Sequence, residues 1–165
     1  MHNINPNNYM RTINILGGLL IVLLLGPAAF SQTASAPTDN LKPVMVEYKS
    51  IAIGTPANEV RHKLGKAEID ENNGLFYRFS NDEFVQIRLD SDHNVRLIAI
   101  TYSGKNAPKP ADVFGAGVKI EPRPDGSIYQ LVQYPKAGFW VAYSQSAGTD
   151  PTTTVTLQKM RTATL

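Results

Sequence analysis

Apolar and polar side chains alternate along much of the chain after residue 74, which is the pattern of half-buried strands. Residues 84–90 read FVQIRLD, so Val85, Ile87 and Leu89 alternate with polar side chains. Because successive side chains of a strand point to opposite faces, this strand should be buried on one face only. The same pattern predicts strands over residues 75–80, 84–90, 95–102, 127–134, 138–145 and 153–160.

The period changes to that of a helix directly after Thr55. Ala57, Val60 and Leu64 have the spacing i, i+3, i+7 and therefore share one helical face. Thr55 is a preferred N-cap residue, and Gly65 is a preferred stop because it adopts positive φ without strain. These signals predict a short amphipathic helix that ends at Gly65.

The second half of the chain repeats the order of these signals. Residues 110–115, PADVFG, predict a shorter helix, and a glycine-containing turn and three strands follow it as in the first half. The segment at 103–109, SGKNAPK, has the composition of a linker. We therefore expect an α+β protein in which a short helix packs on a three-stranded antiparallel sheet, duplicated as residues 44–103 and a degenerate, β-rich unit at 104–165.

A pattern of apolar, glycine and capping residues surrounds the first helix: Ile51, Ile53, Gly54, Thr55, Glu59, Val60, Leu64, Gly65, Lys66 and Ala67. The aromatic pair Phe76-Tyr77 and residues 89–95 follow it. The first set resembles the opening of the SmpA/OmlA (BamE-like) domains, and the second resembles their middle and end. The resemblance implies a binding module of outer-membrane protein assembly, and two units in tandem imply the fold of the β-lactamase inhibitor protein.

The N-terminal region has the layout of a secretory signal peptide. Arg11 precedes the uninterrupted apolar run of residues 15–25, which is shorter than the roughly 20 residues that span a bilayer. The small residues Ala29 and Ser31 favour cleavage between Ser31 and Gln32. We expect residues 1–31 to be removed on export; cleavage after the pair Ala34/Ala36, or an uncleaved membrane anchor, are the alternatives.

The composition of the chain limits its possible cellular location and its possible classes of partner. After cleavage, residues 32–43 form a small, polar and flexible leader, and the protein is periplasmic or secreted. The chain has 16 Lys and Arg against 14 Asp and Glu, and this small excess of positive charge argues against nucleic-acid binding. It has no Cys, which excludes a lipid anchor, a disulfide and a thiolate metal site. Peripheral contact with a membrane surface is a further alternative.

Candidate catalytic groups are few and scattered. Of the three histidines, His2 falls in the signal region, His62 on the helix away from its apolar stripe, and His93 in a turn between strands. Asp90 and Asp92 bracket that turn, where aspartate commonly bonds to the backbone. We therefore expect no enzyme activity, no metal and no cofactor. The alternative is a small hydrolase built from His93, Asp92 and Asp90.

Aromatic residues are the remaining candidates for function. Along residues 138–145, alternation places Phe139, Val141 and Tyr143 on one face, which we expect to be core, and Trp140 on the other. Exposed aromatic residues are frequent anchors of protein interfaces. The alternative is that Trp140 packs on a helix or on the other repeat.

The prediction for function is a non-catalytic module that binds a protein of the cell envelope through its sheet face. Its apolar anchors would be Trp140 and Tyr134, and its polar contacts Arg78 and Arg88. An alternative in the same class is an inhibitor that binds an extracytoplasmic enzyme.

Overall fold

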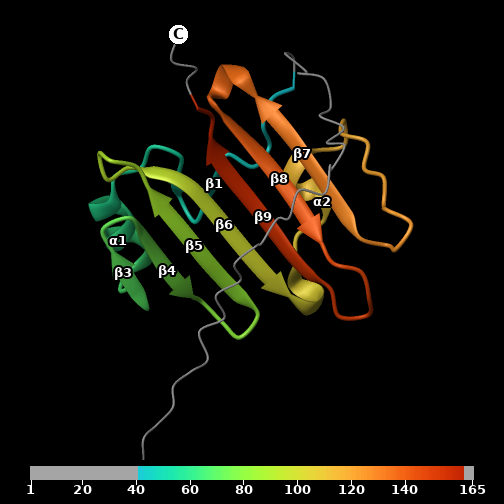
Figure 1. The fold of residues 1–165 in the computed structure, drawn as a ribbon, viewed down its shortest axis with the longest axis horizontal. Coiled ribbons are helices and arrows are strands. Elements are labelled where there is room, and N and C mark those ends of the chain that lie inside the picture. Colours follow the sequence, from blue (N-terminus) through green and yellow to red (C-terminus); the bar gives the residue numbers. More distant parts are fainter. Residues whose placement is uncertain (1–40, 162–165) are drawn as a thin grey trace, which may run out of the picture. The chain divides into compact units, whose positions relative to one another are not determined.

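Strands make up most of the secondary structure, and a single antiparallel sheet holds seven of them (Figure 1). The computed structural model describes residues 41–161. The sheet order is β3-β4-β5-β6-β9-β8-β7, and a separate hairpin pairs β1 with β2. The elements are β1 (Glu47–Tyr48), β2 (Ile51–Ala52), α1 (Ala57–Leu64), β3 (Ile69–Glu71), β4 (Gly74–Arg78), β5 (Glu83–Leu89), β6 (Val95–Ser103), α2 (Pro110–Phe114), β7 (Ile128–Tyr134), β8 (Phe139–Gln145) and β9 (Thr152–Lys159), with single 3₁₀ turns at Gly104–Asn106 and Pro135–Ala137.

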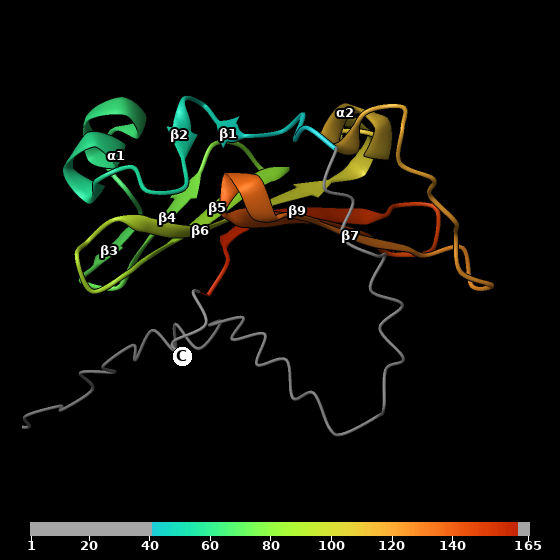
Figure 2. The same ribbon diagram turned by 90° about the horizontal axis from the view of Figure 1, so that it is seen from above.

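The helices and the small hairpin all lie on one side of the sheet. Figure 2 shows α1, the β1–β2 hairpin and α2 on the same side of the seven strands. We call this side the covered face and the opposite side the open face. The alternation predicted for β5 is confirmed, because Val85, Ile87 and Leu89 are buried on the covered face. Their buried companions on the other central strands are Ile98, Ile100, Val141, Tyr143, Val155 and Leu157.

Helix α1 is held against the turn between β5 and β6 as well as against the sheet. Ala57 and Val60 are its buried residues, and Gly65 ends it with φ of 78°, as expected. The backbone N–H of Ala57 donates to the carbonyl of His93 at 2.9 Å. The expected Thr55 cap is wrong: the N-cap position is occupied by Pro56, and Thr55 Oγ1 instead accepts from the N–H of Ala52 at 3.1 Å.

The predicted fold class is wrong. We expected two units, each with a helix on its own three-stranded sheet, and the protein instead has one mostly β layer with the eight-residue α1 and the five-residue α2. The reason is the pairing of β6 with β9, which joins the strands of both halves through seven residue pairs. Residues 44–103 and 104–161 therefore share one continuous sheet.

The signal peptide, its cleavage between Ser31 and Gln32, and residues 32–40 of the leader lie outside the described residues. Among the helices of residues 41–161, none is long and apolar enough to cross a bilayer.

Candidate functional site

The open face carries a row of side chains that crosses five strands. Residues that oppose each other in an antiparallel ladder share a face of the sheet. Trp140 on β8 opposes Gln133 on β7 and Gln158 on β9, and the row continues through Leu97 on β6 to Arg88 on β5. We call these five residues the Trp140 row. It brings two of the predicted binding residues, Trp140 and Arg88, onto one surface.

The spacing of the strands sets the distance between these two residues. Three strand intervals separate β5 from β8, which corresponds to about 14 Å. Trp140 is partly buried and Arg88 is exposed. No helix of the described chain packs over the indole, because α1 and α2 both lie on the covered face (Figure 2). The row therefore offers an apolar ring and a cation within the footprint of one ordinary protein interface.

Arg78 lies on the same face but in a different row, and its guanidinium already has partners. Its Nε donates to Glu68 Oε1 at 3.2 Å, and its guanidinium carbon lies 4.8 Å from the centroid of the Phe84 ring. The Phe84 ring stacks on Phe76 at 6.4 Å. The alternation along β4 and β5 places both rings on the open face, although neither was among the predicted binding residues.

Tyr134 does not belong to this surface. It is 3% exposed and opposes Phe139 on the covered face, with the two ring centroids 5.8 Å apart. Burial raises the pKa of its phenol. Its proposed role as an exposed anchor is therefore wrong. A signal for this was present in the sequence, because a hairpin that closes around residues 135–138 pairs Tyr134 with Phe139, which we had assigned to the core.

The residues of the hydrolase alternative, Asp90, Asp92 and His93, all lie at the turn between β5 and β6. His62 is exposed on α1 and His93 is exposed in the β5–β6 turn. Within residues 41–161, no group of three or more His, Cys, Asp or Glu side chains is arranged to hold a metal ion. Asp90 and Asp92 lie close together in the turn, where the Asp90 carboxylate accepts hydrogen bonds from the backbone.

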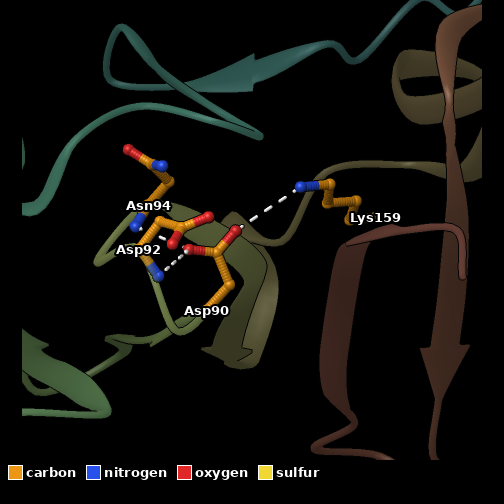
Figure 3. A network of polar contacts seen from close by, with 4 residues as sticks. All are labelled: Asp90, Asp92, Asn94 and Lys159. Atoms are coloured by element: carbon orange, nitrogen blue, oxygen red, sulfur yellow. Dashed lines mark hydrogen bonds and ion pairs between the residues drawn. The ribbon is translucent and has the colours of Figure 1, made fainter.

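Asp90 organises its turn through backbone hydrogen bonds (Figure 3). Its Oδ1 accepts from the N–H of Asn94 at 2.9 Å and from that of Asp92 at 3.1 Å. Its Oδ2 lies 3.4 Å from Lys159 Nζ on β9. The Asn94 backbone bond, with help from Lys159, holds the pKa of this carboxyl below its usual value. Asp90 thus fixes the turn and links it to β9.

A second polar cluster, which the sequence analysis missed, attaches the β1–β2 hairpin to the sheet. Tyr48 Oη donates to Glu83 Oε1 at 2.6 Å, and Lys49 Nζ lies 4.8 Å from the Phe79 ring centroid. Burial, reinforced by Glu83, raises the pKa of the Tyr48 phenol, and the same two causes raise that of Tyr102 to about 12. Both phenols therefore remain neutral donors at physiological pH.

The chain matches no protein-family model, no curated protein and no solved structure. The resemblance of its first helix and strands to SmpA/OmlA domains stays a prediction.

Proposed function

We propose that the chain is a non-catalytic binding module of the bacterial cell envelope, periplasmic or secreted, that engages a protein partner through the open face. The observation that carries the proposal is the position of Trp140, the single tryptophan, on a sheet face that no helix of residues 41–161 covers and in line with Arg88. A partly exposed indole is a costly residue to leave in water, and interfaces use such residues as anchors.

The neighbours of Trp140 suit protein recognition. Gln133 and Gln158 flank it across the two adjacent strands, so each can exchange hydrogen bonds with a partner's backbone while the ring is buried. Arg88 adds an exposed cation at the other end of the row, which suits an acidic group of a partner. Arg78 is a weaker candidate, because Glu68 and the Phe84 ring already engage it.

Capture from native envelope after cross-linking tests the proposal. Replacing an anchor residue at an interface centre costs about 2 kcal/mol or more, so Trp140→Ala should lose most of the captured partner. Ser144→Ala is the matched control, because Ser144 is exposed on the same strand and the same face. The two variants should have the circular dichroism spectrum of the unaltered protein. Equal capture by all three proteins would refute an interface at Trp140, and unfolding of Trp140→Ala would assign the ring to structure.

A further inference from the structure

The seven-stranded sheet ends in two very different edge strands. At one edge, β3 is three residues long, and two of them, Asp70 and Glu71, are carboxylates. Asp70 also receives two bonds from Arg61 of α1, at 2.7 and 2.8 Å. Short, charged edges resist pairing with another chain, so this edge is protected.

The opposite edge, β7, has none of these features. It is seven residues long and reads IYQLVQY, without a charge or a proline. It pairs with β8 at all seven residues in one continuous register, and no described strand lies beyond it. An edge strand leaves the N–H and C=O groups of every second residue directed away from its only neighbour. Long, uncharged and regular edges of this kind are templates for a further strand.

We propose that β7 pairs antiparallel with β7 of a second copy of this chain, about a twofold axis perpendicular to the sheet. Opposed residues share a face, so one residue must oppose its own copy across the axis, and only Leu131, the middle residue, pairs all seven positions in this way. In this register Tyr129 opposes Gln133 of the second copy, and Leu131 opposes itself. No charged residue of either strand is placed against another.

A second copy is favoured as the occupant because β7 is complementary to itself. On the open-face side of the paired strands, the twofold axis places Tyr129 of each copy against Gln133 of the other, and the two Leu131 side chains meet at the centre. Cross-strand pairs of this kind stabilise a ladder. Cations flank β7 at both ends: Arg123 lies 5.6 Å from the Tyr129 ring at the start of the strand, and Lys136 lies in the turn that follows it. The axis puts the Arg123 residues of the two copies at opposite ends of the paired strands, so they do not repel each other.

This inference uses the edge of the sheet, whereas the proposed function uses Trp140 and Arg88 on the open face. Gln133 is the one residue that β7 contributes to the Trp140 row. An axis perpendicular to the sheet leaves the open faces of both copies on the same side. The dimer would then present two Trp140 rows to one partner surface.

Charge changes at two positions test both the dimer and its register. Tyr129 and Gln133 are exposed and lie about 13 Å apart within one strand, so charges placed there do not interact strongly within one copy. Across the proposed interface they are directly opposed. Tyr129→Lys with Gln133→Lys places two like-charged pairs across the axis, whereas Tyr129→Lys with Gln133→Glu places two opposite-charged pairs there.

The mass in solution should be measured by light scattering over a range of concentrations, with the protein as isolated from the expressing cell. We expect the unaltered protein and the Lys/Glu variant to have twice the monomer mass, and the Lys/Lys variant to have half of theirs. Gln86→Lys, exposed at the centre of the open face, is the control and should stay dimeric.

Three results would overturn the proposal. A monomeric unaltered protein at every concentration excludes the dimer, even if a strand of another protein binds β7. A Lys/Lys variant that stays dimeric moves the interface elsewhere, and a Lys/Glu variant that dissociates like Lys/Lys excludes the register. Should the variants fail to fold, amide exchange in β7 of the unaltered protein decides the matter, because it must slow as the concentration rises.

Discussion

His93 shows how a single residue can be strained by the turn it occupies. It has φ of 57°, in the left-handed region that glycine adopts freely and other residues adopt at a cost of about 1–2 kcal/mol. Its side chain is exposed, and its backbone makes the hydrogen bonds: its N–H donates to the carbonyl of Asp90 at 3.1 Å, and its carbonyl accepts from the N–H of Ala57 at 2.9 Å. The position therefore needs a backbone conformation and not an imidazole.

His93→Gly should consequently raise the free energy of unfolding by about 0.5–1 kcal/mol, after the entropy that glycine adds to the unfolded chain is subtracted. Urea unfolding followed by circular dichroism measures the change. Asp92→Gly is the matched control in the same turn. It has no positive φ to relieve and should lower the stability. A loss of stability in His93→Gly would mean that the imidazole has a structural role.

The lowered pKa of Asp90 predicts how the stability of the folded protein changes at acidic pH. Its carboxyl has a lowered pKa in the folded protein, so it contributes stability above its unfolded pKa of about 3.9, and that contribution is lost as the pH falls through the folded pKa. Asp90→Asn should therefore be less stable than the unaltered protein at neutral pH, and the difference should shrink as the pH falls below about 4.

Unfolding midpoints measured from pH 2 to pH 7, a range set around the ordinary carboxyl pKa of about 4, check this expectation. Lys159→Met separates the two causes of the shift. The Asn94 backbone bond is the larger cause, so removing Lys159 should keep most of the pH dependence. An acid response of Asp90→Asn that matches the unaltered protein would contradict the assignment.

At the scale of elements, α1 illustrates a short helix that is stabilised through its buried face. Its eight residues are too short to be stable alone, so its stability comes from the packing of Ala57 and Val60. Val60 is fully buried. Val60→Ala should cost about 2 kcal/mol by denaturant unfolding, whereas Asn58→Ala, exposed on the same helix, should change little. Equal effects would show that α1 is held by its backbone bonds to the β5–β6 turn alone.

The strands could be predicted from the sequence, because alternation is a local signal. Each of the six predicted strands lies within two residues of an observed one, from β4 to β9. The pairing of β6 with β9 could not be predicted from the sequence. The alternation of β6 specifies which of its faces is buried, but not which distant strand lies beside it. Residues 95–102 and 153–160 carry no charge pair or turn that identifies them as neighbours.

The candidate site was predictable to the same degree. The alternation of β8 placed Trp140 on the face opposite Phe139 and Val141, and this is confirmed. The Trp140 row could not be predicted, because Leu97 and Arg88 are aligned with Trp140 only through the β6–β9 pairing. Tyr134 was selected for its residue type, without following the register of its own hairpin.

For the whole molecule, the shared sheet predicts one cooperative unfolding transition. Ile98 of β6 opposes Leu157 of β9, and both are fully buried on the covered face. Unfolding of either half would therefore strip the other half of its core side chains and leave a long unpaired strand at its edge. Two units with separate sheets and separate cores would unfold in separate transitions.

Two probes can follow the halves separately in the same denaturant series. Trp140 fluorescence reports on β8, since the chain contains one Trp, and amide exchange of β5 reports on the first half. We expect coincident midpoints. Leu157→Ala should lower both by the same amount, at a cost of about 3 kcal/mol, with the denaturant slope unchanged. A variant in which fluorescence changes before β5 opens would show that the β6–β9 pairing does not couple the two halves.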